Sequence, residues 1–313
     1  MNVIIKTTMN DLIGTIITGA QLNEILNISD RQKNNLLLLK FMNDDDIHYG
    51  MHYSDGLNKD IISFNPSGSC LRGGIYITTL KNYHHYIHKY GNYARQVYVN
   101  PTTLIYIEGD KLKCNEVFLE KRENKYDLIK RLFKEYINDL QDVIELVKDC
   151  LESIKYIEEK YITPELIFEL VKYNGLILQY IDEKYKTNDI LIEAVKQNGN
   201  SLRFIKLQCR THEIILQAVK QNGFAIIHVE QEDRTIEIML TAIRQNVRAS
   251  ILIEAQYKTH EILLEIVNID GLFLKYIENE YRTEDIISNA IKQNNKAIKY
   301  IEDEYKTEDI ISN

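Results

Sequence analysis

The sequence is poor in proline, glycine and tryptophan. It has 3 prolines, 13 glycines and no tryptophan among 313 residues, against 21 tyrosines. Proline and glycine are the residues that most often interrupt helices and strands, so their scarcity indicates a chain rich in regular structure. With 44% hydrophobic and 27% charged residues, the composition is that of a globular protein rather than of a disordered one. The length suggests two domains or one extended array.

Cysteine is scarce as well, and its spacing argues against two kinds of site. The four cysteines have wide, unrelated spacings, with no CxxC pair and no paired histidines nearby; they are Cys70, Cys114, Cys150 and Cys209. This spacing predicts neither a zinc site nor a disulfide framework. We expect reduced thiols in a cytosol-like compartment and no bound metal or cofactor.

Positive charge and long apolar runs are also lacking. The formal net charge is −8, which argues against a general affinity for nucleic acid, because phosphate backbones are bound by a basic face. The N-terminus is mildly apolar but contains Lys6 and Asp11, so it lacks the long apolar core of a signal peptide or membrane anchor. We therefore expect a protein partner and neither a nucleic acid nor a membrane; the oligomeric state stays open.

A repeat of fixed period dominates the C-terminal half. The string AVKQNG occurs at Ala194–Gly199 and again at Ala218–Gly223, and a threonine recurs every 24 residues, at positions 163, 187, 211, 235, 259, 283 and 307. Fixed self-similarity of this kind is typical of a solenoid, in which each unit packs against its neighbours. Places within a unit are counted below from this threonine, which is place 0.

Each unit has the pattern of two helices. The threonine is a helix N-cap followed at place 2 by an acid, which suits the positive end of the helix dipole, and apolar residues at places 3, 4, 7 and 8 form one buried face. We predict that this first helix ends at Asn-Gly, where the glycine takes the left-handed conformation. A shorter second helix follows, with its apolar face at places 15, 17 and 18, as in Leu178, Tyr180 and Ile181.

The repeat sets the predicted domains. Asp139 can cap a helix in the same register, so we expect an α-solenoid over 139–313, with seven full units and a partial eighth. Residues 1–122 are predicted to form a small α+β head and residues 123–138 a connecting helix. The unit at 235–258 departs from the pattern at Val247, Arg248 and Ser250, which is consistent with a local bend or with a partner-specific notch.

The head has short apolar runs between turns rich in Gly, Asn, Pro and Ser. These runs predict strands at Ile75–Thr78, Gln96–Val99, Leu104–Ile107 and Val117–Leu119, with a helix at Leu80–Tyr90. The fold class is therefore mainly α, with a small α+β domain before the helical repeats.

Both parts resemble a known family. The string GLNKDIISFNPSGSCLRGGIYITT at 56–79 resembles the N-terminal domain of repeat proteins from mimivirus-like giant DNA viruses, and the AVKQNG units resemble DUF4116-like helical repeats of unknown function in the same viruses. The positions that carry the first resemblance are His48 or His52, Tyr53, Gly56 to Asn58, Gly68, Cys70, Gly73, Gly74 and Tyr76. The resemblance implies a viral repeat protein, in the host cytoplasm or the virion, and implies no activity.

The head offers two candidate sites. His84, His85 and His88 have the spacing of a metal pair on a helix, but no acidic or cysteine ligand has a matching spacing, which favours a solvated or packing role. The Gly73-Gly74-Ile75-Tyr76 turn loosely resembles the glycine-tyrosine strand of ADP-ribosyltransferases, in which case His48 or His52 would hold the NAD ribose, Tyr76 would stack on nicotinamide, and Glu108 or Glu116 would be the catalytic acid. The alternative is a structural turn in which the glycines supply backbone angles closed to other residues.

On the array, equivalent residues are predicted to form rows. One row is basic with a glutamine beside each base: Lys172; Lys196 and Gln197; Lys220 and Gln221; Arg244 and Gln245; Lys292 and Gln293. A second row is acidic: Glu230, Glu254, Glu278 and Glu302. Extended partners usually bind such rows on solenoids, so the prediction is an interaction scaffold for host or viral protein, with an NAD-using transferase or a virion structural component as alternatives.

Overall fold

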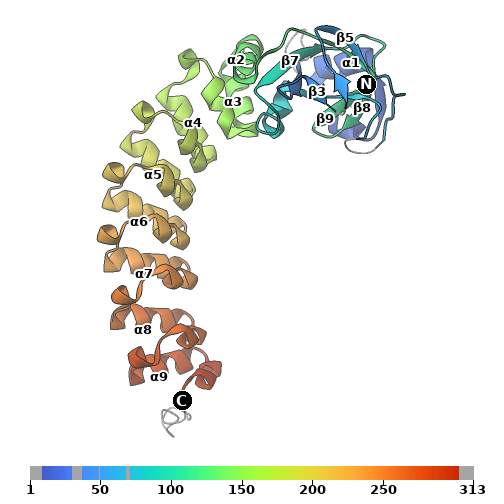
Figure 1. Cartoon of the computed structure of the whole chain (residues 1–313). Helices are drawn as coiled ribbons and strands as arrows, with labels where there is room; N and C mark the ends of the chain where they lie inside the picture. Colours follow the sequence, from blue (N-terminus) through green and yellow to red (C-terminus); the bar gives the residue numbers. More distant parts are fainter. Residues whose placement is uncertain (1–8, 30–36, 49, 68–70, 303–313) are drawn as a thin grey trace, which may run out of the picture. The chain divides into compact units, whose positions relative to one another are not determined.

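The chain divides into two compact units. A computed structural model describes residues 9–29, 37–48, 50–67 and 71–302, and the chain contacts separate Met1–Tyr161 from Ile162–Asn313 (Figure 1). The first unit thus contains the first repeat, 139–161, together with the head and the connecting helix. The boundaries near 122 and 138 rest on the sequence repeat and stay a prediction.

An antiparallel sheet forms the body of the first unit. Its strands run in the order β1-β8-β9-β6-β2-β7-β10-β5, and β11 pairs with β7; a separate hairpin joins β3 to β4. The strand bounds are β1 Ile16–Thr18, β2 Leu38–Met42, β3 Ile47–His48, β4 Met51–His52, β5 Gly56–Lys59, β6 Ile75–Thr79, β7 Tyr93–Tyr98, β8 Leu104–Glu108, β9 Lys111–Cys114, β10 Glu116–Leu119 and β11 Glu123–Asn124. The four predicted strands are confirmed as β6, β7, β8 and β10.

Helices cover part of this unit. Side chains from successive strands form its core, for example Leu38, Ile75 and Ile105. The helical elements are η1 Met9–Leu12, α1 Gly19–Ser29, η2 Leu80–His85, α2 Lys125–Tyr136, α3 Leu140–Asp149, η3 Leu151–Tyr156 and η4 Glu159–Tyr161, where η marks a 3-10 helix. The predicted connecting helix is confirmed as α2, and the predicted cap at Asp139 is confirmed by a hydrogen bond of 3.0 Å from Asp142 N to its Oδ1.

The predicted helix at Leu80–Tyr90 is wrong in length and type. The structure has only the 3-10 helix η2, capped by Thr79, and turns follow it to residue 90. The stretch is rich in Asn, Tyr and His, which are weak helix formers, so packing of Leu80, Tyr83 and Ile87 against the unit decides its conformation.

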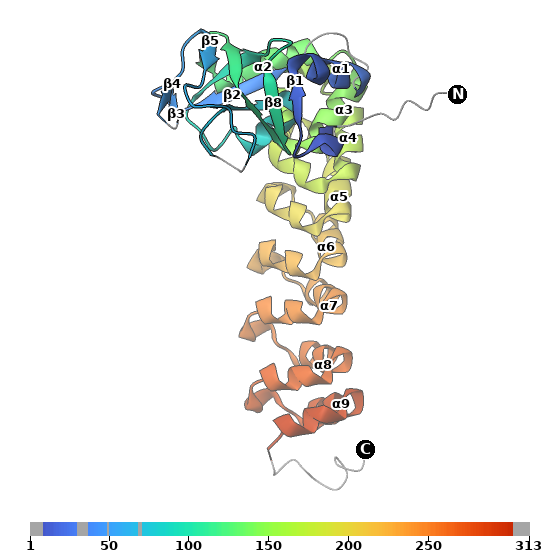
Figure 2. The ribbon, with the colours of Figure 1, turned by 90° about the vertical axis from the view of Figure 1, so that its right-hand side faces the viewer.

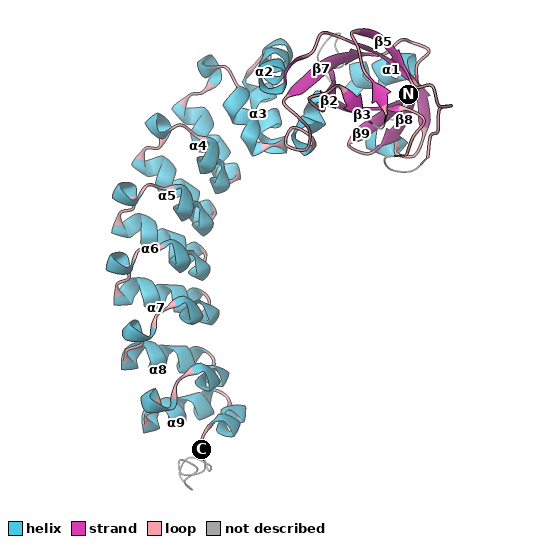
Figure 3. Ribbon diagram, viewed as in Figure 1, coloured by secondary structure: helices cyan, strands magenta, loops and turns pink. Residues whose placement is uncertain are grey.

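The second unit is built from the repeat (Figures 2 and 3). Each full repeat has an α-helix, a six-residue 3-10 helix and a short 3-10 turn. The α-helices are α4 Pro164–Tyr173, α5 Asn188–Gln197, α6 His212–Gln221, α7 Ile236–Gln245, α8 His260–Ile269 and α9 Glu284–Gln293. The 3-10 helices are η5 Gly175–Tyr180, η7 Gly199–Phe204, η9 Gly223–His228, η11 Val247–Leu252, η13 Gly271–Tyr276 and η15 Asn295–Tyr300; the turns are η6 Glu183–Tyr185, η8 Leu207–Cys209, η10 Gln231–Asp233, η12 Ala255–Tyr257 and η14 Asn279–Tyr281.

The first helix of the repeat is as predicted. The threonine caps it in most units, as where Ile214 N donates to Thr211 Oγ1 at 3.3 Å. Thr283 is an exception, because its side chain makes no cap bond to the helix and contacts Asp285 instead. The buried residues of each helix stand at places 3, 4, 7 and 8, as Ile214, Ile215, Ala218 and Val219 do in α6.

The second helix of the repeat differs from the prediction. It is a 3-10 helix, and its buried residues stand at places 14, 15 and 18 rather than 15, 17 and 18. A 3-10 helix has about three residues per turn, so places 15 and 18 share a face. In the described repeats of the second unit, place 17 is half-buried in five and exposed in the sixth. Tyr276, at place 17, is 53% exposed, while Phe273 at place 14 is buried.

The predicted left-handed glycine is also wrong. Gly175, Gly199, Gly223 and Gly271 are not among the described residues with positive φ. The preceding residue, which is asparagine or, before Gly271, Asp270, ends the α-helix in an extended conformation and caps the 3-10 helix, as where Asn200 N donates to Asn198 Oδ1 at 3.1 Å. Glycine is needed for close approach, because a Cβ on Gly199 would stand 2.3 Å from Ala218 O in the next repeat.

Candidate interaction surfaces

The predicted basic row lies at place 9, on the outer side of the α-helices. Its members are exposed; they are Lys172, Lys196, Lys220, Arg244 and Lys292, with Asn268 in the remaining described repeat of the second unit. Two of them form exposed ion pairs, Lys172 with Glu169 at 3.1 Å and Arg244 with Glu265 at 2.7 Å. We call these five cations the basic ladder. None of its side chains is buried in the stack of repeats.

The glutamines beside the ladder have a different position and role. Gln221 Oε1 accepts a hydrogen bond of 2.6 Å from Gly199 N, and its Nε2 donates to Gln197 O at 3.3 Å. Gln197, Gln245 and Gln293 make the same two bonds to the preceding repeat. The amide thus satisfies a backbone N–H and a backbone carbonyl at the helix end, both of which need a partner.

The residues at place 12 of one repeat and at places 7 and 10 of the next repeat differ together between junctions. Four junctions combine glycine at place 12 with alanine at place 7 and glutamine at place 10 of the next unit: 175/194/197, 199/218/221, 223/242/245 and 271/290/293. At the junction between units 235 and 259 the three residues are Val247, Ile266 and Ile269. A side chain at place 12 removes the close approach, and isoleucine at place 10 cannot make the amide bonds.

A second basic row was missed in the sequence. The residue directly before the threonine is Lys186, Arg210, Arg234, Lys258 or Arg282 in successive units. Arg210 donates through Nε to Ile205 O at 2.8 Å and through Nη1 to His228 O at 2.6 Å. It therefore joins the carbonyls at the ends of two successive 3-10 helices, as Arg234 and Arg282 also do. The 24-residue spacing was the signal that could have revealed this row.

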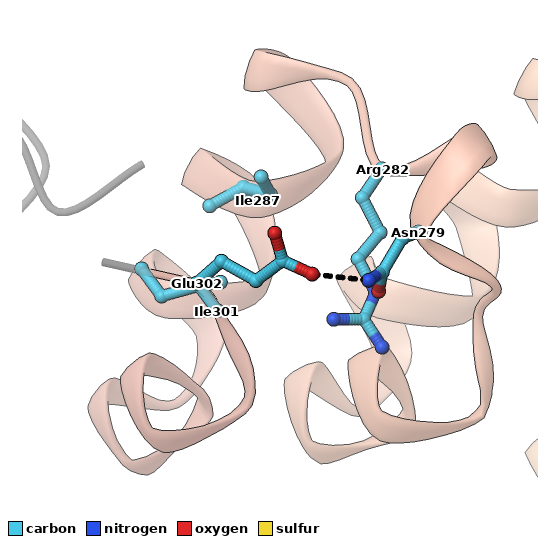
Figure 4. A pocket seen from close by; sticks show the side chains of 5 residues that line it. All are labelled: Asn279, Arg282, Ile287, Ile301 and Glu302. Carbon is cyan, nitrogen blue, oxygen red and sulfur yellow. Dashed lines mark hydrogen bonds between the residues drawn. The ribbon is translucent and has the colours of Figure 1, made fainter. Parts of the chain in front are cut away.

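The predicted acidic row pairs with these buried bases. Glu230, Glu254 and Glu278 lie 3.7, 2.7 and 3.6 Å from Arg210, Arg234 and Lys258. Glu302 bonds Asn279 at a small pocket between the last two described repeats, which is also lined by Arg282, Ile287 and Ile301 (Figure 4). Arg282 is already held there by Tyr300 O, so this pocket belongs to the packing between repeats.

In the head, a buried lysine brings two of the predicted motif residues together. Lys40 Nζ donates to Tyr76 O at 3.1 Å and lies 4.3 Å from the centre of the Tyr53 ring. Burial lowers the pKa of Lys40 to about 7 and raises that of Tyr53. His52 is exposed on the β3–β4 hairpin.

The predicted glycine pair forms a tight turn. Gly73 and Gly74 have φ of 91° and 147°, and a Cβ on Gly73 would stand 2.5 Å from Ser63 O. Gly74 N donates to Asp60 Oδ2 at 2.9 Å. These angles and contacts are ones that only glycine accepts readily. Gly68 and Cys70, which belong to the same predicted motif, lie outside the described residues.

The residues of the NAD-using alternative are spread over the sheet. Tyr76 is on β6 and Glu108 is on β8, joined through Lys111, which lies 4.7 Å from the Tyr76 ring and 3.7 Å from Glu108. Glu116 is on β10, beyond β2 and β7, and pairs with Lys59 at 3.7 Å. Strands β2 and β7 therefore separate Glu116 from Tyr76 in the order of the sheet. Tyr76 and Glu108 thus share a contact through Lys111, whereas Glu116 lies on a separate strand, and the NAD-using alternative stays a prediction.

The histidine cluster is held by neighbours in the first unit. His88 Nε2 lies 3.0 Å from Glu152 Oε2, and the rings of His84 and His85 are 4.1 Å apart. His48, the other candidate of the NAD-using alternative, is half-buried, and burial together with Lys40 lowers its pKa. Within the described ranges, no group of three or more His, Cys, Asp or Glu side chains is placed to hold a metal ion.

Comparison with known proteins places the repeat. The family described as a domain of unknown function, DUF4116, matches residues 163–208, 212–253 and 260–306. A putative ankyrin repeat protein, R868, of Acanthamoeba polyphaga mimivirus is 36% identical over 90 residues, which are 26% of this chain and 44% of that protein. The uncharacterized protein R869 of the same virus is 34% identical over 98 residues, 29% of this chain and 70% of that protein.

Two further findings bear on the class of protein. No solved structure matches the chain. In the part of the chain that the structure describes, no helix has the length and apolar character to cross a membrane. The matches to the repeat and to its viral relatives show that the chain belongs to a family of DUF4116 repeat proteins of mimivirus-like viruses.

Proposed function

We propose that the protein is an interaction scaffold whose repeat array binds a host or viral protein through the basic ladder. The observation that supports this most is that the recurring residues of a repeat have different roles. Glycine at place 12, glutamine at place 10 and the base before the threonine all serve the stacking of repeats. The cation at place 9 recurs at an exposed position, and among the described ion pairs of the ladder only that of Arg244 with Glu265 joins two repeats.

The expected partner carries an acidic surface. Equivalent cations one repeat apart present charge at a regular spacing of about 10 Å, the usual distance between packed helices, and opposite charge on the partner steers association. The relative named as a putative ankyrin repeat protein supports a binding role for the array. The site of action in this proposal is the host cytoplasm or the virion.

Charge reversal on the intact chain tests the proposal. Lys196→Glu with Lys220→Glu removes two neighbouring cations of the ladder, and Lys296→Glu with Lys299→Glu makes the same change of charge on the 3-10 helix η15. Affinity capture from infected cells is expected to lose partners with the first pair and to keep them with the second. If every partner captured by the unchanged protein still binds the first pair, the ladder is not the binding surface.

A further inference from the structure

The exposed side of the 3-10 helices changes character in the middle of the array. Place 16 is exposed in each described repeat of the second unit, so its residue is not required for stacking. The residues there are Gln179, Arg203, Ile227, Ile251, Lys275 and Lys299. Two consecutive repeats thus carry isoleucine where the others carry a polar or cationic side chain.

A third apolar side chain extends this patch. Places 13 and 16 share a face, because a 3-10 helix has about three residues per turn, and place 13 of the first of these repeats is Phe224. Phe224, Ile227 and Ile251 are 40%, 58% and 64% exposed, and η9 packs against η11. We call these three residues the apolar window. Clustered exposure of large apolar side chains marks binding surfaces.

Positive charge lies beside the window. Arg248 is exposed on η11, three positions before Ile251, and Arg203 is exposed on η7, which packs against η9. Arg203 and Arg210 add to the effect of burial in lowering the pKa of His228 on η9, so their charge reaches the window. The nearby acids Glu230 and Glu254 are each paired with an arginine, at 3.7 and 2.7 Å.

We infer that the apolar window binds an acidic segment of a partner protein that inserts two apolar side chains, one at each repeat. This is a second surface of the proposed scaffold, on the 3-10 helices rather than on the helices of the basic ladder. Neighbouring helical layers are about 10 Å apart, which is about one turn of a polyproline II chain, whose three residues per turn put positions i and i+3 on the same face. We therefore expect the partner segment to have two apolar residues three positions apart, with acidic residues on both sides of them. Charge complementarity favours this occupant, because Arg203 and Arg248 are exposed beside the window while Glu230 and Glu254 are paired with arginines.

Fluorescence anisotropy with the full chain and a synthetic peptide tests the inference. The probe is a labelled peptide of about ten residues, long enough to span the layers as a polyproline II chain, with two leucines three positions apart, serines between them and acidic residues at both ends. We expect Ile227→Glu with Ile251→Glu to weaken its binding at least about tenfold, because apolar contact is lost and like charge is introduced. Arg203→Glu with Arg248→Glu should weaken it as well.

Matched controls separate this surface from the basic ladder. Lys196→Glu with Lys220→Glu is expected to leave peptide binding unchanged. A peptide with serine in place of both leucines should lose binding at least about tenfold, and circular dichroism checks that each variant is folded. Equal binding of the serine peptide, equal binding by the isoleucine variants, or no binding at all would overturn the inference and leave the ladder experiment unaffected.

A second copy of the chain is the competing occupant. Light scattering coupled to gel filtration measures the mass of the unchanged protein and of the Ile227→Glu/Ile251→Glu variant. The inference expects the same mass for both. A dimer that the isoleucine substitutions dissociate would instead assign the window to self-association.

Discussion

Lys40 is a buried lysine of the head, and its burial lowers its pKa. Its ammonium makes a hydrogen bond to Tyr76 O and a cation–π contact with Tyr53, but burial lowers its pKa from 10.5 to about 7. Below pH 7 both the folded and the unfolded chain carry the charge, so the full cost of burying it is present. Above pH 7 the folded chain gives up the proton first, and that cost is progressively removed.

Stability is therefore expected to rise between pH 7 and 8.5 through Lys40. In this range the unfolded chain binds a proton that the folded chain does not, which gives a slope that approaches roughly 1 kcal/mol per pH unit. Above pH 9 the raised pKa of Cys114 acts in the opposite direction. Urea unfolding of Lys40→Met should lose this slope, whereas Lys59→Met, at an exposed position, should keep it. An equal slope in both variants would contradict the assignment.

Gln221 and Lys220 are adjacent, but their side chains are expected to contribute very differently to stability. Gln221→Ala removes the bonds to Gly199 N and Gln197 O and leaves a buried N–H without its partner, which should cost about 1–3 kcal/mol. Lys220→Ala removes only an exposed side chain and should change the free energy of unfolding by less than about 0.5 kcal/mol. Urea denaturation of both variants measures the difference, and equal costs would show that the amide bonds do not stabilise the stack.

At the scale of the element, the helices and strands that were predicted correctly are those whose signals lie within the element itself. Caps and buried faces depend on residues within one helix, so the threonine register and places 3, 4, 7 and 8 predict the α-helices correctly. The exposure of the basic ladder follows from the same helical face. Across strands, alternation and turn residues predict β6, β7, β8 and β10 within a few residues.

The missed features depend on the neighbouring repeat. The glycine of Asn-Gly was interpreted as a left-handed cap, but its role is set by a carbonyl in the next unit, as Gly199 is by Ala218 O. The base before the threonine contacts a carbonyl 18 residues further on, as Arg210 does at His228. The glutamine of the expected binding row reaches back 22 residues to a backbone N–H. Such contacts follow from how the units stack, which the pattern of a single unit does not contain.

The three junction residues are expected to be coupled energetically. Gly199→Val alone should cost at least about 3 kcal/mol, because its Cβ would stand 2.3 Å from Ala218 O and the repeats would have to separate. Adding Ala218→Ile and Gln221→Ile reproduces the Val247, Ile266 and Ile269 junction. The triple variant should then be less destabilised than the sum of the three single variants by at least about 1 kcal/mol, as measured by urea unfolding. Simple additivity would show that the residues vary independently.

At the scale of the second unit, stability is a sum of repeats and of the interfaces between neighbours. At each of the four Gly-Ala-Gln junctions, the glycine lies close to the alanine carbonyl of the next repeat. Three of these junctions are consecutive, from unit 163 to unit 235, and the fourth joins units 259 and 283. Between units 235 and 259 the glutamine bonds are missing, although Arg244 and Glu265 still pair across that junction at 2.7 Å. The weakest interface of the described array is therefore expected at Val247.

Native-state hydrogen exchange should reveal this interface. The amides of Gly199 and Gly223 donate to glutamine side chains at 2.6 Å, so they should exchange only when two repeats separate. At the Val247 junction the glutamine position is occupied by Ile269, which has no amide oxygen, so the Val247 amide should exchange faster. Because subglobal opening follows the weakest contacts, residues 259–302 should lose protection as one block before units 187 and 211 do. The triple variant Val247→Gly, Ile266→Ala and Ile269→Gln creates a Gly-Ala-Gln junction at this place. In this variant, residues 259–302 should be protected from exchange as strongly as units 187 and 211. A gradual loss of protection from the C-terminal repeats inward, with no step at Val247, would mean that the buried arginines rather than the glutamines set the strength of the interfaces.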